Sequence, residues 1–187
     1  MHTLRISHPA LQGAHREATI DFYTRVLGME LVLRQPNLDY EPEEHLFFHV
    51  GNDNFIAYFV PKEGIDPSTY RPAQSGSGHM DHLALDIELH DLPGWERRLR
   101  EAGVEYEGPV DRGYERSLYF KDPNNVTVEL LAWLTPPPAG VPQADLIRRA
   151  QAIREARGAA FIEDQDVRQA IAEIQTQPVG IGSAPRP

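Results

Sequence analysis

Two histidines and one glutamate are the residues of this sequence whose types and positions could do chemistry. His8, His82 and Glu129 each fall in a segment rich in apolar and β-branched residues, which predicts a β-strand. Taking a carboxylate such as Glu129 into an apolar setting is costly unless a cation or hydrogen bonds compensate. Two imidazoles and one carboxylate, with the opposite coordination positions open, form the ligand set of non-haem Fe(II) oxygenases. The set predicts a metal centre in which the cation offsets the burial of Glu129.

Each of these residues also has a purely structural interpretation. Glu129 could lie at the rim of a sheet, solvated or paired with an arginine, because glutamate is seldom fully buried. His8 and His82, taken singly, could be core or rim residues of their strands. His79 is the serious rival to His82, but its spacing of three residues puts the two on opposite faces of a strand. The position of the three candidates in an internal repeat favours the metal interpretation.

The repeat is about fifty residues long and positions the three candidates. Residues 1–60 predict a strand, a helix and three more strands, and residues 78–134 predict the same order again. His8 and His82 fall in the first strand of their repeats, and Glu129 falls in the last strand of the second. A single module leaves one sheet face uncovered, whereas two can curve around a cleft. The predicted fold class is therefore α+β, with two βαβββ modules forming a curved mixed sheet around a metal cleft.

The expected elements follow from apolar periodicity and from turn-forming residues. Those of the first module are a strand at 3–10, a helix at 16–28 and strands at 30–35, 45–50 and 54–60. Those of the second are a strand at 80–88, a helix at 91–103 and strands at 104–108, 116–121 and 126–133.

The composition changes after the second module. Residues 135–141 form a proline-rich linker, which cannot continue a sheet. Residues 142–175 predict a helical extension, and residues 176–187 predict a disordered tail. The apolar stripes of the extension need a cover, either the core or a second subunit; they consist of Leu146, Ala150 and Ile153, then Val167, Ile171 and Ile174.

Charge and cysteine content exclude several kinds of partner and chemistry. The 18 basic and 28 acidic residues give a net charge of −10, which opposes binding to a phosphate backbone. Because the sequence has no cysteine, a metal must use histidine, aspartate or glutamate. No apolar run has the length of a membrane span, and no secretory signal is visible, so we expect a cytoplasmic protein.

The repeat with "ISHPALQGAHREATIDFYTRVLGMELV", "MDHLALDIELH" and "RSLYFKDPNNVTVELL" resembles the vicinal oxygen chelate superfamily over about residues 1–134. That superfamily includes glyoxalase I, extradiol ring-cleaving dioxygenases, epimerases and antibiotic-sequestering proteins. The resemblance implies metal positions at His8, His82 and Glu129. Its glyoxalase branch takes a further carboxylate from the last strand of the first module. An alignment of the two last strands puts Tyr58 opposite Glu129, so that carboxylate is missing and a three-ligand site is favoured.

Two further residues point to the ring-cleaving branch. Tyr119 stands ten residues before Glu129 and Arg112 seventeen before it, as in members that cleave hydroquinones, where such residues contact the substrate oxygens. Their structural alternatives are a half-buried strand aromatic and a solvated loop cation. Ser7 and Asp81 occupy places where those dioxygenases often carry a second histidine, which puts the outer-shell acid and base chemistry in question.

The sequence thus leads to one principal hypothesis and two alternatives. The principal one is a metal-dependent ring-cleaving dioxygenase with Fe(II), Mn(II) or another divalent metal, acting with dioxygen on a small phenolic substrate of the catechol or hydroquinone type. The alternatives are a glyoxalase- or epimerase-type isomerase or lyase, and a protein that sequesters a ligand without turnover. Since the larger dioxygenases have four modules, we expect a homodimer, with neither nucleic acid nor membrane as a partner.

Overall fold

The computed structural model describes residues 6–37, 40–52, 54–63 and 80–176 of the 187-residue chain. Three features expected from the sequence lie wholly or partly outside these ranges: the start of the first strand, His79, and the tail after Thr176. The described residues form two four-stranded sheets and accompanying helices, an α+β fold. None of the helices in this part of the chain is long and apolar enough to cross a membrane.

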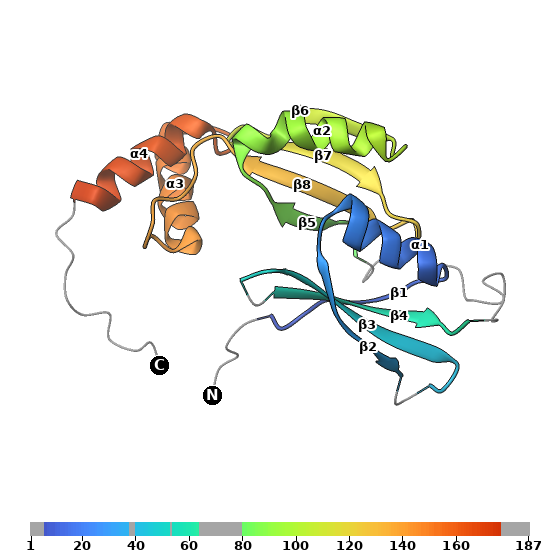
Figure 1. Cartoon of the computed structure of the whole chain (residues 1–187). Helices are drawn as coiled ribbons and strands as arrows, with labels where there is room; N and C mark the ends of the chain where they lie inside the picture. Colours follow the sequence, from blue (N-terminus) through green and yellow to red (C-terminus); the bar gives the residue numbers. More distant parts are fainter. Residues whose placement is uncertain (1–5, 38–39, 53, 64–79, 177–187) are drawn as a thin grey trace, which may run out of the picture. The chain divides into compact units, whose positions relative to one another are not determined.

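The two sheets have the same strand order, which confirms the repeat. The first sheet runs β1-β4-β3-β2 and the second runs β5-β8-β7-β6 (Figure 1). In the first, β1 pairs with β4 in parallel and the other pairs are antiparallel, so the sheet is mixed. The strands are β1 Ala10–Gln12, β2 Glu30–Pro36, β3 Glu43–Gly51, β4 Asn54–Pro61, β5 Leu83–Asp86, β6 Tyr106–Asp111, β7 Glu115–Lys121 and β8 Thr127–Trp133.

The chain divides into two compact units that do not coincide with the two repeats. The first contains Met1–Leu83, Glu96–Tyr106 and Phe120–Val128. The second contains Ala84–Trp95, Glu107–Tyr119 and Glu129–Pro187.

The first strand begins later than the sequence suggests. We expected a strand at residues 3–10 with His8 inside it, but β1 begins at Ala10. Pro9 has no N–H to give to a ladder, and its carbonyl accepts the N–H of Ala57 at 3.0 Å. His8 therefore lies just before its strand, as His82 lies just before β5.

The helix of the first repeat covers one face of the first sheet. It runs as α1 Arg16–Asp21 and continues as a π-helical turn, η1 Phe22–Val26, before Gly28 ends it at φ +76°. The ring of Tyr23 stacks on Phe48 with 4.9 Å between centroids. The buried side chains of this face are Leu46 and Phe48 of β3 and Ile56, Tyr58 and Val60 of β4.

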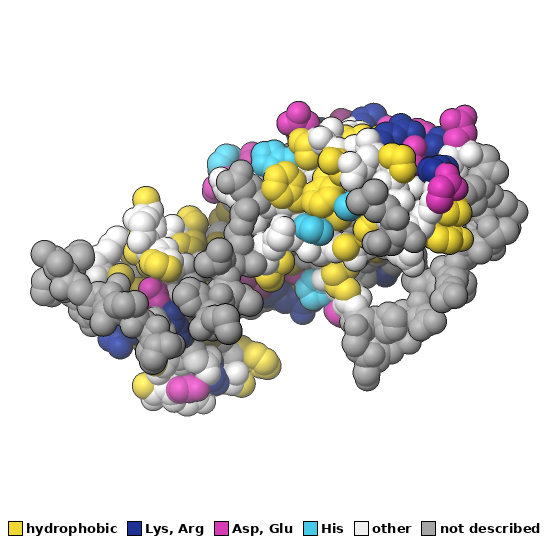
Figure 2. All heavy atoms as spheres, turned by 90° about the horizontal axis from the view of Figure 1, so that it is seen from below, with side chains coloured by type: hydrophobic (Ala, Val, Ile, Leu, Met, Phe, Trp, Pro, Cys, Tyr) yellow, Lys and Arg dark blue, Asp and Glu magenta, His cyan; other side chains and the backbone are white. Residues whose placement is uncertain are grey.

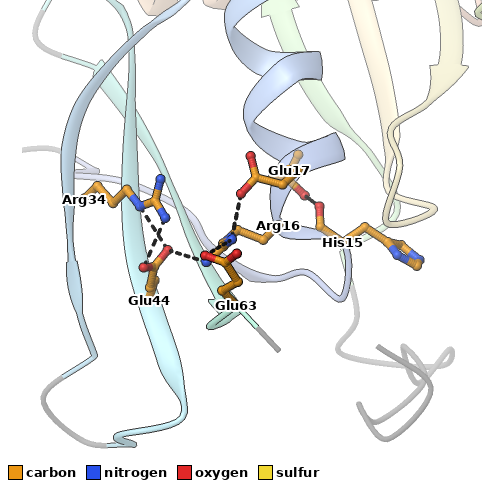
Figure 3. Close-up of polar contacts among 7 residues, drawn as sticks. His15, Arg16, Glu17, Arg34, Glu44 and Glu63 are labelled. Atoms are coloured by element: carbon orange, nitrogen blue, oxygen red, sulfur yellow. Dashed lines mark hydrogen bonds and ion pairs between the residues drawn. The ribbon is translucent and has the colours of Figure 1, made fainter. Parts of the chain in front are cut away.

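Charged side chains join the start of α1 to β3 and β2 of the same sheet (Figure 3). Arg16 lies 2.8 Å from Glu17, 3.7 Å from Glu44 and 3.6 Å from Glu63. Arg34 of β2 donates two hydrogen bonds to Glu44, at 3.0 and 3.2 Å. Ion pairs with exposed members contribute about 0–1 kcal/mol each, so this network orients α1 more than it stabilises the fold.

A buried carboxylate lies against the helix-covered face of the first sheet. Asp122, which is 5 % exposed, accepts hydrogen bonds from the hydroxyls of Tyr58 at 2.6 Å and Tyr23 at 3.3 Å. Its other oxygen accepts the backbone N–H groups of Asn124 and Val126, both at 2.8 Å. Burial raises the pKa of both tyrosines far above the ordinary value, which keeps the phenols protonated and donating.

We expect Asp122→Ala to lower the free energy of unfolding by about 3 kcal/mol, because several donors then lose their acceptor. Tyr23→Phe is the graded control: it removes one of these donors while Tyr58 still reaches the carboxylate, and should cost about 1 kcal/mol. Urea denaturation of the metal-free protein measures both values. Equal, small losses would show that the carboxylate is not held by this network.

The C-terminal extension forms two helices, α3 Gln143–Arg157 and α4 Asp164–Thr176, as the sequence predicts. Their apolar stripes are covered within the same unit. Leu146, Ala150, Val167 and Ala170 form a buried cluster with Trp133 of β8. Partly buried side chains packed on this cluster are Tyr114, Leu131, Val141, Ile153, Ile162, Ile171 and Ile174.

An ion pair closes the turn between α3 and α4. Arg157 donates two hydrogen bonds to Asp166, at 3.1 and 2.8 Å, and Asp166 is 1 % exposed. The guanidinium of Arg157 holds the pKa of Asp166 below its ordinary value, in spite of the opposing effect of burial. The carboxylate also accepts the N–H of Glu163 at 2.9 Å, which caps the start of α4.

The ion pair of Asp166 with Arg157 should make the free energy of unfolding depend on pH. Since the folded pKa lies below the unfolded one, the contribution of the carboxylate is complete above about pH 4 and is lost as the pH falls through the lowered folded value. We expect Asp166→Asn to be clearly destabilised at pH 7, and the difference from the wild type to narrow as the pH falls below about 4. Urea denaturation at pH 7 and at about pH 3 measures this. A gap between the two proteins that is the same at pH 3 as at pH 7 would contradict it.

Candidate functional site

Glu129 lies on the face of β8 that is opposite its fully apolar face. Val128, Leu130 and Ala132 are at most 1 % exposed and share one face of the strand. Glu129, Leu131 and Trp133 share the other, together with the side chains of β7 that pair with them. We call this second surface, made by these three residues with Glu115 and Tyr119, the Glu129 face. Glu129 itself is 4 % exposed, so its burial requires compensation.

Three of the candidate residues are in contact on this face. The hydroxyl of Tyr119 donates a hydrogen bond to Glu129 Oε1. The Nε of Arg112 donates to the Tyr119 hydroxyl at 3.3 Å, and its guanidinium lies 5.2 Å from the centre of that ring. Burial and then the bond to Glu129 raise the pKa of Tyr119, which keeps its hydroxyl proton available for donation.

Two further carboxylates, neither of them predicted from the sequence, lie near this chain of contacts. Burial raises the pKa of Asp86, at the end of β5. Burial, followed by the charges of Glu129 and Asp86, raises the pKa of Glu115. The signal for Glu115 in the sequence is its even spacing, because it precedes Tyr119 by four residues and shares its face. Carboxyl groups whose pKa is raised toward neutrality are suited to hold or move a proton.

The two candidate metal histidines are oriented in the same way. Asp81 accepts a hydrogen bond from Nδ1 of His82 at 2.8 Å. Ser7 Oγ lies 3.1 Å from Nδ1 of His8. Because the Asp81 carboxylate can only accept, the proton of a neutral His82 lies on Nδ1 and the lone pair on Nε2, as with the outer-shell partners of metal-binding histidines. Ser7 and Asp81, which stand where such dioxygenases often carry a second histidine, thus each contact Nδ1 of the neighbouring histidine.

Backbone pairing identifies the equivalent positions of the two modules. The N–H of Gly13 donates to the carbonyl of Phe59, and the N–H of Ile87 donates to that of Leu131, both at 2.9 Å. Gly13 and Ile87 each follow the candidate histidine of their module by five residues. Phe59 of β4 is therefore equivalent to Leu131 of β8.

The residue equivalent to Glu129 is Ala57, two positions before Phe59. This corrects the expected alignment, which put Tyr58 opposite Glu129. Tyr58 is fully buried on the helix-covered face and bonds to Asp122. The conclusion drawn from the alignment is unchanged, because alanine supplies no carboxylate for a fourth ligand.

The face of the first sheet that carries Ala57 is aromatic and partly exposed. His45 stacks on Phe59 with 4.4 Å between ring centroids, and Phe47 lies 4.7 Å from His45 and 4.8 Å from His8. Figure 2 shows hydrophobic and histidine side chains interspersed on the face turned to the viewer. Burial and then the nearby His8 lower the pKa of His45. Its Nε2 is buried and has no hydrogen-bond partner among the described residues.

The candidate ligands divide between the two compact units, since His8 and His82 belong to the first and Glu129 to the second. In the part of the chain that the structure describes, no three histidine, aspartate or glutamate side chains are grouped closely enough to hold a metal. The donor set nevertheless fits a divalent cation. Two imidazoles held through Nδ1 and a buried carboxylate are the nitrogen and oxygen ligands that Fe(II), Mn(II) and Zn(II) accept.

Paired βαβββ modules of equal strand order define the vicinal oxygen chelate fold. The model of the Glyoxalase/Bleomycin resistance protein/Dioxygenase superfamily matches residues 5–130, and the chain belongs to that superfamily.

Similar proteins include enzymes named for ring cleavage. Biphenyl-2,3-diol 1,2-dioxygenase 3 of Rhodococcus globerulus is 33 % identical over 68 % of this chain and 63 % of its own length. MhqO of Bacillus subtilis, whose name places it with ring-cleaving dioxygenases, is 28 % identical over 69 % of this chain and 40 % of its own. The chain thus spans less than two thirds of either relative.

A solved structure and a second class of enzyme also match. The structure of a Bacillus subtilis protein described as a dioxygenase is 26 % identical and covers 70 % of this chain and 41 % of its own, with a TM-score of 0.59. Lactoylglutathione lyase of Pseudomonas aeruginosa is 23 % identical over 67 % of this chain and 80 % of its own length. Both branches named in the sequence analysis are therefore represented among the relatives.

Proposed function

We propose that this protein is a ring-cleaving dioxygenase in which His8, His82 and Glu129 hold Fe(II) or Mn(II), or another divalent metal. The substrate is a small phenol of the catechol or hydroquinone type, and dioxygen is the second substrate. The observation that carries the proposal is the chain of contacts from Arg112 through Tyr119 to the buried Glu129. The names of the ring-cleaving relatives support the same class of reaction.

Tyr119 and Arg112 would then act on the oxygen atoms of the substrate. When bound, the metal would supply open coordination positions for substrate and dioxygen, so that no protein nucleophile is needed. The hydroxyl of Tyr119 would donate to a substrate oxygen as negative charge develops there. The guanidinium of Arg112 would stabilise that charge and hold the Tyr119 hydroxyl in place.

The first sheet offers a surface suited to a planar ring. His45, Phe47 and Phe59 are partly exposed aromatic side chains with neighbouring ring centroids less than 5 Å apart. Aromatic rings gain from offset or edge-to-face contact with such a surface. This supports an aromatic substrate over a small aliphatic one.

An oxygen-uptake screen tests the proposal. Protein loaded anaerobically with Fe(II) is mixed with air-saturated catechols and hydroquinones, and both oxygen consumption and the coloured ring-opened product are recorded. We expect uptake in stoichiometric proportion to product. Protein that demonstrably retains iron and consumes no oxygen with any of these phenols would overturn the dioxygenase proposal.

A metal-dependent isomerase, epimerase or lyase is the second candidate. The match to lactoylglutathione lyases favours it, as do Glu115 and Asp86, whose raised pKa values suit a group that moves a proton. Metal analysis separates the candidates, because iron or manganese suits the oxygenase and nickel, cobalt or zinc suits the isomerase. A ligand-sequestering protein, the third candidate, needs no metal at all.

The proposed function also has consequences for the domain boundaries and for the number of subunits. Residues 1–134 would form the catalytic domain, with residues 135–141 as a linker to the helical extension. We propose a homodimer, because this chain has two modules where larger ring-cleaving enzymes have four. Light scattering in solution tests the dimer, and a monomeric mass at micromolar concentration would exclude it.

A further inference from the structure

The α3–α4 extension packs on the same face of β8 that carries Glu129. Alternation along the strand places Leu131 and Trp133 on the Glu129 face, two and four residues beyond Glu129. Trp133 belongs to the core cluster of the extension, and Leu131 packs against that cluster. The helices therefore cover one end of the surface on which Tyr119 and Glu129 meet.

The turn between the two helices touches the turn that carries Arg112. The N–H of Asp164 donates to the carbonyl of Gly113 at 3.0 Å. A Cβ atom at Gly113 would lie 2.6 Å from the carbonyl oxygen of Ile162, and the residue has a φ of +94°. Both facts require glycine at this position. The backbone of the residue next to Arg112 is thus packed directly against the helical extension.

The same turn also contacts the end of β8 and the residue that follows it. The ring of Tyr114 meets Trp133 edge to face, with centroids 5.0 Å apart, and the carbonyl of Tyr114 accepts the N–H of Leu134 at 2.9 Å. The N–H of Arg112 donates to the carbonyl of Glu115 at 2.9 Å and closes the turn. Residues on both sides of Gly113 are therefore fixed by hydrogen bonds.

The contacting part of the extension is itself rigidly held. The pair of Arg157 and Asp166 spans the connection between the helices, and Arg154 donates to the carbonyl of Ala159 at 2.8 Å. Gly158 ends α3 in the left-handed conformation at φ +70°. Because these contacts hold the connection between the two helices in one position, the residues that pack on it are held in place as well.

We propose that the α3–α4 extension is part of the binding site, in which it positions Arg112, and that Gly113 is the positioning residue through which it acts. Without the extension, the turn at residues 112–114 would lose a hydrogen bond and its apolar support, and the guanidinium would leave the Tyr119 ring. The role of Arg112 toward a phenolic oxygen rests on the proposed function, but the positioning itself does not.

Gly113→Ala tests the positioning, with Gly103→Ala as its matched control. Gly103 also has a positive φ, +71°, but among the described residues no atom lies within 4 Å of a Cβ built there. Hydrogen exchange followed by mass spectrometry reports on the amides of residues 111–115. We expect exchange to be about tenfold faster or more in Gly113→Ala and unchanged in the control. Equal exchange in the two variants would overturn the proposal.

A double-mutant cycle tests whether the effect reaches the ligand through Arg112. The probe is 4-nitrocatechol, a coloured catechol, bound anaerobically to the Fe(II)-loaded protein and followed by absorbance. We expect Gly113→Ala and Arg112→Gln each to weaken binding by about tenfold, and the double variant to bind no more weakly than Arg112→Gln alone. Additive losses would show that Gly113 acts on the fold in general and not through Arg112.

Two further measurements cover a Gly113→Ala protein that does not fold and a wild-type protein that binds no phenol. If Gly113→Ala does not fold, Arg157→Gln loosens the connecting turn without touching the Arg112 turn, and faster exchange at residues 111–115 is again expected. Unchanged exchange in Arg157→Gln would count against the proposal. Wild-type protein that retains iron but binds no 4-nitrocatechol would overturn the proposed function, while the exchange result would still decide whether the extension positions Arg112.

Discussion

Replacing Glu129 by alanine is expected to lower the affinity for Fe(II) or Mn(II) by more than about 100-fold, because even outer-shell partners of a metal site contribute 10- to 100-fold. The fold of the metal-free protein should lose only about 1 kcal/mol, since Tyr119 keeps its hydrogen bond from Arg112. Metal content after dialysis measures the first effect, and urea denaturation in the presence of a chelator measures the second.

Glu115→Ala is the matched control for this experiment. Glu115 is a carboxylate on the same face as Glu129 and feels its charge, but it is not a proposed ligand. Metal affinity within a few-fold of the wild type is expected for this variant. If Glu129→Ala retained metal as well as Glu115→Ala does, Glu129 would be a structural carboxylate that the Tyr119 hydroxyl satisfies.

Replacing Tyr119 by phenylalanine is expected to reduce turnover by about 10²- to 10³-fold, the usual loss when one donor to a developing oxyanion is removed. The hydrogen bond strengthens as charge grows on the substrate oxygen, so it acts on the transition state more than on binding. Steady-state oxygen uptake should therefore show a lower kcat, while the iron content and KM change little.

The structure allows a different outcome for Tyr119, because its hydroxyl also bonds to Glu129. If Tyr119 only orients that ligand, Tyr119→Phe should weaken metal binding by about 10- to 100-fold and leave the rate per bound metal unchanged. Tyr106→Phe is a suitable control, since its hydroxyl bonds to Arg100 and Glu96 and not to the Glu129 face. Rate per metal and metal content together decide between the two roles of Tyr119.

Periodicity in the sequence was sufficient to predict the repeat, the strand content and the C-terminal helices. The start of β1 was not predictable in detail, because it depends on how Pro9 meets the ladder of β4. The residue equivalent to Glu129 was predicted one position too far along β4, at Tyr58 instead of Ala57. An alignment of β4 with β8 by their preceding turns assumes turns of equal geometry, whereas the ladder itself sets which residue faces which side.

Contacts in the candidate site could be predicted only between residues whose separation along the chain implies them. Tyr119 and Glu129 lie ten residues apart on antiparallel neighbours joined by a short turn, so their spacing already suggests that they meet. Asp86 comes from a strand distant in sequence from β7, and only the pairing of the sheet brings its charge near Glu115. The contact of Gly113 with the α3–α4 turn depends on packing that no local pattern records.

The buried bonds of Asp122 have a consequence for how this chain could have arisen by duplication. The carboxylate belongs to the second repeat, and the tyrosines that satisfy it, Tyr23 and Tyr58, belong to the first. Either repeat expressed alone would keep one half of this arrangement: the first would keep two phenols that bond only to each other, at 3.1 Å, and the second a carboxylate without its tyrosine donors. We therefore expect each repeat to depend on the other for stability. Their separately produced fragments should acquire structure only when mixed, as complementing halves of one folding unit.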